Sequence, residues 1–441
     1  MSDTSRRELL LGTAGLTGLG LAGLTSYAQG VPSGAPKKLL VVYAEGGWDV
    51  TFCFDPKLGC RECSIEGPEV DEDPDDPQDR EAVATFGNHR IVVNGRKRPA
   101  VRQFFQRWGN RAHVINGVWT GSIAHDPCRY RILTGTPDGG SPDLTSITGY
   151  THGADLPLGS VDLSGWGIAG PLASTSGRIG ASSQIVPLLD DTRSFRRQTT
   201  DASRQYPLFR AAAEDDAATE EYLGRRVDML RRRYGDGGLN DKSLDDLVGS
   251  LERAARFRAE AGRIMDTLYV GQDTRFNEQL RIGTELMLEG MCHAVTVDTR
   301  VDWDTHDRNA LQHVYYQDLF ASLDAMMRQL AERELLDDVV IAVVSEMTRT
   351  PLRNGAGGKD HWGHTSAMLL GAVRGDATSG GTDGLLESLP VDLQTGVLTP
   401  ASRGGRLIKY DNLVAGILEL VGVEPERWLP GVVPFRGAHL A

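Results

Sequence analysis

The chain has 441 residues, a length that allows several small domains or one large α/β domain with insertions. Its 60 acidic and 47 basic side chains give a formal net charge of −13. This excess of acids argues against general binding to nucleic acid or to anionic membranes, so the expected partner is a small molecule or a metal ion.

Residues 1–28 are predicted to be an export signal. Arg6 and Arg7 directly precede an apolar, glycine-rich run over residues 9–24, and Ser26 and Ala28 supply small residues for cleavage. A membrane anchor is the alternative, but the run is shorter than the ~20 apolar residues of a spanning helix. We therefore expect twin-arginine export to the periplasm or the medium, as a folded protein without an anchor after cleavage.

After a linker at 29–37, residues 38–441 are predicted to form one α/β domain. Apolar runs predict strands at 38–43, 113–118, 294–297, 339–344 and 365–370. Helical patterns fall at 100–108, 126–133, 311–335 and 410–421. This alternation indicates a mostly parallel sheet with helices on both faces.

Segments of a different kind interrupt the alternation. Residues 55–88 are too acidic and too rich in proline to pack, and we expect a surface loop. Residues 136–190 carry few helical signals and predict loops and short strands. Residues 203–290 predict a helical insertion, with helices at 219–234 and 244–268.

The five cysteines are too few for a fold held together by disulfides. Cys60 and Cys63 form a C-x-x-C pair without a second such pair, so a zinc or redox role has little support. A local disulfide or two inert thiols remain as alternatives.

Side chains of metal-ligand type gather just after the predicted strands. In open α/β sheets, functional sites lie at the carboxyl ends of the strands, so these positions are informative. The candidates are Asp49, His125, Asp304, His306, Glu346, Asp360, His361 and His364.

Carboxylates and imidazoles together are ligands for divalent metals, and two ions can clamp the attacking and leaving oxygens of an ester transfer. Singly, each residue has a simpler explanation, because an Asp after a strand often caps a helix and a His is often structural. Their recurrence at several strand ends predicts a divalent metal site, with two ions expected and zinc, manganese and calcium undecided.

Two arginines are further candidates, because a guanidinium can bind a phosphate or sulfate group. Arg129 lies one helical turn after His125 and is expected to steady the oxyanion of a reacting ester. Arg349 has the weaker case. Both arginines are alternatively surface side chains that pair with the excess of acids.

The chain resembles the family called domain of unknown function 1501, which is grouped with the alkaline phosphatase and sulfatase superfamily. The resemblance covers nearly all of the mature chain. It rests on the twin arginines and on four segments: Gly46-Gly47-Trp48-Asp49, Trp303-Asp304-Thr305-His306, Ser345-Glu346-Met347-Thr348-Arg349-Thr350-Pro351 and Asp360-His361-Trp362-Gly363-His364.

The resemblance implies a ligand assignment. It places Asp49 and Glu346 on one metal, with His361 as a further ligand there. Asp304, His306 and, by preference, His364 would hold the other metal.

Residues 125–135 are similar to the sulfatase signature, yet His125 occupies the position of the sulfatase nucleophile. Met347 also stands where alkaline phosphatases have a histidine. His125 is therefore predicted to act at the reacting centre, with three open roles: nucleophile, metal ligand or general acid.

These features predict an exported metal-dependent hydrolase of phosphate or sulfate esters. The alternative is a non-catalytic exported protein that keeps the hydrolase fold and binds another envelope protein. A dinucleotide enzyme is excluded because Gly46 and Gly47 do not supply the spaced glycines of a pyrophosphate turn. Export in the folded state would allow the metal to be taken up in the cytoplasm.

Overall fold

The computed structural model describes residues 35–63, 73, 75–178, 213–235, 241, 243–245, 247–249, 252 and 275–440. The predicted export signal (1–28) and most of the predicted linker (29–37) lie outside these residues. Within the described ranges, no helix combines the length and apolar character needed to span a membrane.

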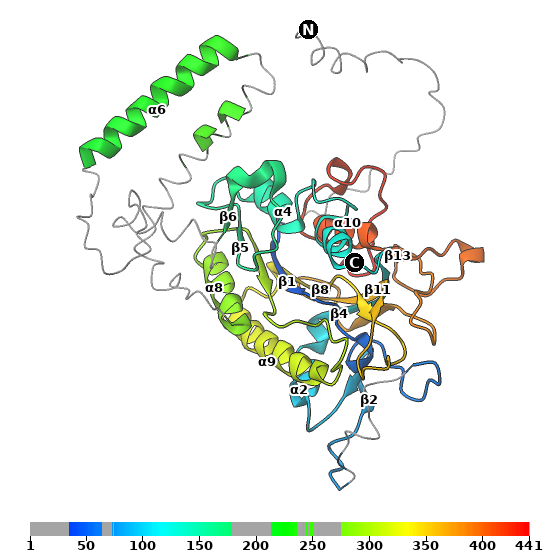
Figure 1. The fold of residues 1–441 in the computed structure, drawn as a ribbon. Helices are drawn as coiled ribbons and strands as arrows, with labels where there is room; N and C mark the ends of the chain where they lie inside the picture. The colour runs from blue at the N-terminus through cyan, green and yellow to red at the C-terminus, as the bar shows by residue number, and fades with distance from the viewer. Residues whose placement is uncertain are drawn as a thin grey trace, which may run out of the picture. The chain divides into compact units, whose positions relative to one another are not determined.

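A nine-stranded sheet forms the centre of the fold (Figure 1). Its order is β12–β4–β11–β8–β1–β7–β5–β6, and β13 pairs with β4. The strands are β1 (Lys38–Ala44), β4 (Ala112–Trp119), β5 (Ser160–Asp162), β6 (Ser176–Arg178), β7 (Ala294–Asp298), β8 (Val339–Ser345), β11 (His364–Gly371), β12 (Ala377–Gly380) and β13 (Ile408–Lys409). Only β11 runs antiparallel to its neighbours, which confirms a mostly parallel sheet.

Both faces of the sheet are covered by helices, as the sequence predicted. Leu40, Val42 and Ala44 of β1 face one apolar cluster, which also contains side chains of α2 (Pro99–Trp108), α8 (Phe276–Leu288) and α9 (Leu311–Glu332). The alternate β1 side chains face a second cluster, with α3 (His125–Thr134), α4 (Leu144–His152) and α10 (Tyr410–Leu420). Burial on both faces explains the continuous apolar run of β1.

The prediction of loops and short strands over 136–190 was wrong in one place, because residues 144–152 form α4. Asp143 caps this helix by accepting a hydrogen bond from the Ser146 N–H at 2.7 Å. Leu144 and Ile147 are buried in the second cluster. Packing on the sheet therefore outweighs the low helix propensity of this Thr- and Gly-containing segment.

The prediction of a surface loop over 55–88 was also wrong toward its end. Within the described part of this segment, β2 (Ala82–Phe86) pairs antiparallel with β3 (His89–Val93). Ile91 and Val93 of β3 are buried, so the hairpin is held by apolar side chains that lie just beyond the acidic segment.

The predicted helical insertion is described in part. The predicted helix at 219–234 is confirmed within α6 (Ala213–Tyr234), and α8 falls at the end of the insertion. Most of the predicted helix at 244–268 lies outside the described residues. All five cysteines are free thiols, so Cys60 and Cys63 form no disulfide.

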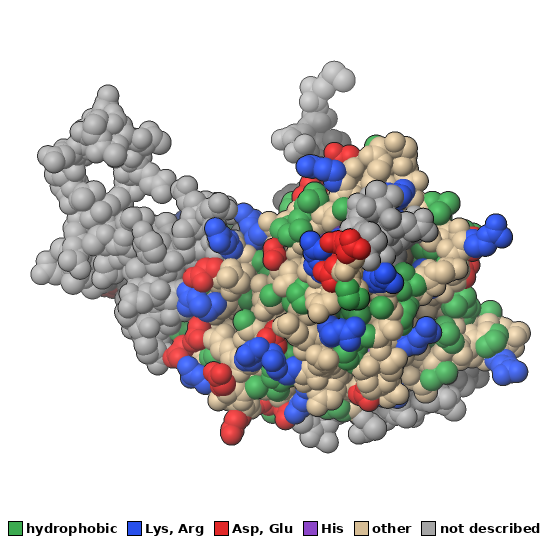
Figure 2. Space-filling view, turned by 90° about the horizontal axis from the view of Figure 1, so that it is seen from below, with side chains coloured by type: hydrophobic (Ala, Val, Ile, Leu, Met, Phe, Trp, Pro, Cys, Tyr) green, Lys and Arg blue, Asp and Glu red, His purple; other side chains and the backbone are tan. Residues whose placement is uncertain are grey.

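Charged side chains of both signs are interspersed over the face shown in Figure 2. Among the described residues visible there, neither sign gathers into one continuous patch.

Candidate metal centre

The carboxyl ends of β1, β7 and β8 lie side by side in the sheet. Ala44, the last residue of β1, pairs with Ser345 of β8, and Tyr43 pairs with Asp298 of β7. The segments that follow these strands therefore leave the sheet at one edge, where sites of open α/β folds form. Glu45 and Glu346 are the first residues beyond two of these strands.

A glycine turn after β1 lets a second segment approach closely. Gly46 has φ +110°, and a Cβ built on it would lie 2.5 Å from the backbone nitrogen of Asp304. Its own N–H donates a hydrogen bond of 2.7 Å to Glu346 Oε1. Only glycine combines this backbone conformation with this approach, so Gly46 brings Asp304 and Glu346 to the same point.

His125, the first residue of α3, lies between these two carboxylates. Its Nδ1 is 2.9 Å from Glu346 Oε1, and its Nε2 is 3.4 Å from Asp304 Oδ2. Contact first with Asp304 and then with Glu346 raises the pKa of His125 to about 10. Without a metal ion the ring is therefore protonated at neutral pH.

Asp304 accepts contacts from several directions. Arg349 Nη2 lies 2.7 Å from Asp304 Oδ1, and the Nε2 atoms of His306 and His361 each lie 3.0 Å from the same oxygen. Partial burial acts to raise the pKa of Asp304, but the contacts with His125, Arg349 and His361 together lower it well below its usual value. Asp304 is consequently ionised.

His306 and His361 lie against each other, with their Nε2 atoms 2.9 Å apart. Asp360 Oδ1 lies 3.0 Å from His306 Nδ1, and the backbone oxygen of Ile123 lies 2.7 Å from His361 Nδ1. Asp360 is thus a partner of a histidine in the centre.

Among the residues that the structure describes, two sets of side chains bring ligand atoms within 4.8 Å of one another, and both include His125. One set is His125, Asp304 and His361, and the other is Glu45, His125 and Glu346. His125 Nε2 is buried and has no hydrogen-bond partner among the described residues. An orphaned imidazole nitrogen beside a carboxylate fits a metal ion, as does the donor set.

Glu45 was missed in the sequence analysis. Burial, followed by the charges of Glu346 and Asp302, raises the pKa of Glu45 to about 7. The signal was present, because Glu45 directly follows the apolar run of β1. The family resemblance instead implied Asp49, four positions further on, as the metal ligand after this strand.

Asp49, predicted as a metal ligand, lies apart from both sets. It caps the short 3₁₀ helix Val50–Phe52. Its Oδ2 lies 2.7 Å from Lys359 Nζ and accepts a hydrogen bond of 2.8 Å from Asn309 Nδ2. The helix-cap alternative thus describes Asp49, with a buried ammonium as its counter-ion.

His364, the other preferred ligand, is also elsewhere. Its Nδ1 lies 2.6 Å from Ser388 Oγ, and the Ser388 N–H donates to the same nitrogen at 3.2 Å. Its position at the start of β11, which pairs with β4, separates it from the neighbouring His361.

The two arginines differ. Arg349 is fully buried, so the alternative of a surface side chain was wrong. Its Nε donates to the Gly47 carbonyl at 2.7 Å while Nη2 contacts Asp304. Arg129 forms an ion pair of 2.6 Å with Asp126 and lies over the Trp166 ring at 4.5 Å, so its role at a reacting centre stays a prediction.

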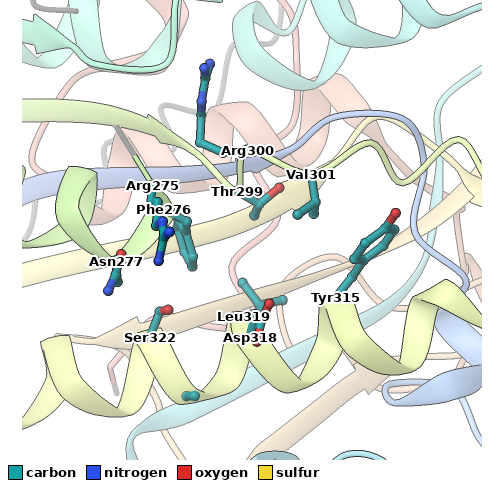
Figure 3. A pocket seen from close by; sticks show the side chains of 11 residues that line it. Arg275, Phe276, Asn277, Thr299, Arg300, Val301, Tyr315, Asp318, Leu319 and Ser322 are labelled. Carbon is teal, nitrogen blue, oxygen red and sulfur yellow. The ribbon is translucent and has the colours of Figure 1, made fainter. Parts of the chain in front are cut away.

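A cavity of about 390 Å³ lies beside the segment that carries Asp304 (Figure 3). Its wall includes Thr299, Tyr315 and Phe276, while the Arg300 side chain points away from it. Thr299 accepts a hydrogen bond of 2.9 Å from Trp303 Nε1, next to Asp304 in the chain. None of the predicted site residues lines this cavity.

Residues 36–429 match a family model described as "Protein of unknown function (DUF1501)". No curated protein matches the chain. Solved structures do match. One is the soluble domain of lipooligosaccharide phosphoethanolamine transferase A from Neisseria meningitidis, with 11% identity over 94% of this chain and 96% of that chain, at a TM-score of 0.38.

Two further solved structures are similar at the same level. The lipoteichoic acid synthase LtaP from Listeria monocytogenes has 9% identity over 91% of this chain and 75% of that chain, with a TM-score of 0.37. A protein in the alkaline phosphatase superfamily from Vibrio parahaemolyticus has 9% identity over 88% and 67%, with a TM-score of 0.32. These similarities concern the overall fold and nothing finer.

Proposed function

We propose that this chain, which belongs to the family described as protein of unknown function (DUF1501), is an exported metal-dependent hydrolase of phosphate or sulfate esters. The observation that carries the proposal is the position of His125 between Asp304 and Glu346, at 3.4 Å and 2.9 Å. Three segments distant in sequence thus deliver ligand-type groups to one point at the carboxyl edge of the sheet. The choice of ester class rests on the family resemblance.

A divalent ion bound here would polarise the ester and stabilise the negative charge that develops on its oxygens. The buried guanidinium of Arg349 holds the Asp304 carboxylate in place from the other side, at 2.7 Å. Because Arg349 is also bonded to the Gly47 carbonyl, Asp304 has little freedom to move. Such preorganisation is what electrostatic stabilisation of a transition state requires.

Glu45 is the residue best suited to transfer a proton. Its pKa of about 7 arises first from burial and then from the neighbouring charges of Glu346 and Asp302. A carboxyl group with a pKa near neutrality can protonate a leaving oxygen and accept the proton back. Its carboxylate also lies within 4.8 Å of the ligand atoms of His125 and Glu346. From this position, together with its raised pKa in the metal-free site, we assign Glu45 as the general acid, and His125 as a ligand of the metal.

Export by the twin-arginine route is part of the proposal and is supported by Arg6, Arg7 and the apolar run after them. Replacing both arginines by lysine is expected to retain the full-length precursor in the cytoplasm. Cell fractionation with antibody detection measures this. Unchanged export of the double variant would contradict the route.

The hydrolase proposal is tested by loading the purified mature chain with zinc, manganese or calcium and measuring turnover of aryl phosphates, phosphodiesters and aryl sulfates. We expect turnover with at least one pair of metal and substrate, and loss of more than about 100-fold in kcat/KM for Asp304→Asn.

The matched control is Asp307→Asn, because Asp307 lies on the same segment but is exposed and pairs only loosely with Arg308, at 3.7 Å. It should retain activity. If no tested pair of metal and substrate gives a turnover that Asp304→Asn abolishes, the hydrolase proposal is contradicted and the non-catalytic envelope protein is favoured.

A further inference from the structure

Three histidine rings around Asp304 share one orientation. In each ring Nδ1 faces an oxygen: Glu346 Oε1 at 2.9 Å from His125, Asp360 Oδ1 at 3.0 Å from His306, and the Ile123 carbonyl at 2.7 Å from His361. A carboxylate or carbonyl oxygen can only accept, so each Nδ1 must carry the hydrogen.

The Nε2 atoms of these rings therefore carry lone pairs when the rings are neutral, and all of them point toward Asp304. His306 Nε2 and His361 Nε2 lie 3.0 Å from Asp304 Oδ1 and 2.9 Å from each other. His125 Nε2 lies 3.4 Å from Asp304 Oδ2 and has no hydrogen-bond partner among the described residues. Protons or a cation must lie between these atoms, because facing lone pairs repel one another.

The arrangement matches the way proteins orient metal-binding histidines. A ligating imidazole typically donates its other ring N–H to a carboxylate or a backbone carbonyl, which fixes the tautomer and the ring plane. Glu346, Asp360 and the Ile123 carbonyl occupy these outer positions. Glu346 is also held by the Gly46 N–H at 2.7 Å, so it serves as a fixed acceptor for His125.

The same geometry argues against a second ion at Glu45, His125 and Glu346. The His125 nitrogen that faces Glu346 is Nδ1, at 2.9 Å, and it already donates to that carboxylate. Both nitrogens of His125 could bind metal at once only if the ring lost both protons.

Nor is Asp49 available to a second ion. Thr51 N–H and Oγ–H donate to its Oδ1 at 3.1 and 2.6 Å, while Asn309 and Lys359 occupy its Oδ2. The fully buried ammonium of Lys359 supplies the positive charge beside Asp49 that a second metal ion would otherwise provide.

We propose that the chain binds one divalent ion of zinc type, held by Nε2 of His125, His306 and His361 together with the Asp304 carboxylate. Glu346 and Asp360 are positioning residues that act through the histidines. An imidazole-rich set with one carboxylate suits zinc better than calcium or magnesium. This inference rests on the metal dependence of the proposed function, but not on its reaction.

The test is zinc binding to the chelator-treated mature chain, measured by isothermal titration with ZnCl₂ and by elemental analysis after dialysis. Wild type is expected to bind one equivalent. His361→Ala should lose more than about 100-fold in affinity, whereas Glu346→Gln should keep one equivalent and lose about 10–100-fold, as outer partners of metal ligands do.

His364→Ala is the matched control, because His364 lies three positions from His361 and bonds to Ser388. It should bind zinc as wild type does. Circular dichroism and thermal melting of each metal-free variant show whether weaker zinc binding comes from removal of a metal-binding side chain or from unfolding. The zinc X-ray absorption spectrum reports imidazole ligands directly and should lose imidazole scattering in His306→Ala.

Two equivalents of zinc in wild type would overturn the proposal. Binding that survives His361→Ala but is abolished by Glu346→Gln would place the ion with Glu45 instead, and would also overturn it. One equivalent of zinc without any ester turnover would leave this inference standing and contradict the hydrolase.

Discussion

Replacing Lys359 by methionine is expected to destabilise the protein, because the buried carboxylate of Asp49 loses its counter-ion. The two charged groups lie 2.7 Å apart and both are fully buried. Removal of one partner of a buried ion pair leaves the other charge uncompensated, which costs about 3–5 kcal/mol. Asp49 keeps hydrogen bonds from Thr51 and Asn309, so the lower end, about 3 kcal/mol, is expected.

The measurement is urea unfolding of the metal-free mature chain, followed by tryptophan fluorescence. The double variant Asp49→Asn/Lys359→Met should recover most of the loss, because neither charge is then left alone, which gives a coupling energy of about 2 kcal/mol. Lys37→Met is the control: its exposed pair with Asp338, at 3.5 Å, should contribute less than about 1 kcal/mol. The reasoning would be refuted if Lys359→Met lowered the free energy of unfolding by less than about 1 kcal/mol and if the effects of Asp49→Asn and Lys359→Met were additive in the double variant.

Two further predictions concern the centre. Gly46→Ala should destabilise the chain by about 1–3 kcal/mol and impair zinc binding, because Gly46 has φ +110° and an added Cβ would clash with the Asp304 backbone. Gly404→Ala is the control: Gly404 has φ +87° but open space around it, so this variant should unfold more easily but bind zinc normally. For the metal-free chain, His125 has a pKa of about 10 against 6.5 when unperturbed, so its stabilising contribution is complete below pH 6.5 and is lost as the pH rises toward 10. The urea midpoint of wild type minus that of His125→Gln should therefore fall as the pH is raised from 6 to 10. A difference that stays constant over this range would contradict the raised pKa of His125.

The local patterns of the sequence determined most of the sheet. A strand buried on both faces is largely apolar, and β1 and β8 carry continuous apolar runs. The apolar runs of β4, β7 and β11 are shorter and include polar residues such as Asn116, Thr296 and Ser366. The position of His125 at the start of a helix also followed from local signals, because Pro127 favours the first turn. The family was evident from short segments around Asp304 and Glu346, and the match over 36–429 confirms it.

Only the tertiary structure decided which of the candidate residues meet. Asp49 and Glu45 both follow β1, and a sequence cannot tell that Lys359, some three hundred residues further on, places its ammonium against Asp49. His361 and His364 are separated by two residues, yet strand pairing directs one to Asp304 and the other to Ser388. The helix α4 was likewise hidden, because its stability comes from contacts on the sheet rather than from its own residues. The sequence thus specified the kinds of group at the strand ends, whereas the folded chain alone fixed the distances between them, on which the proposed metal binding depends.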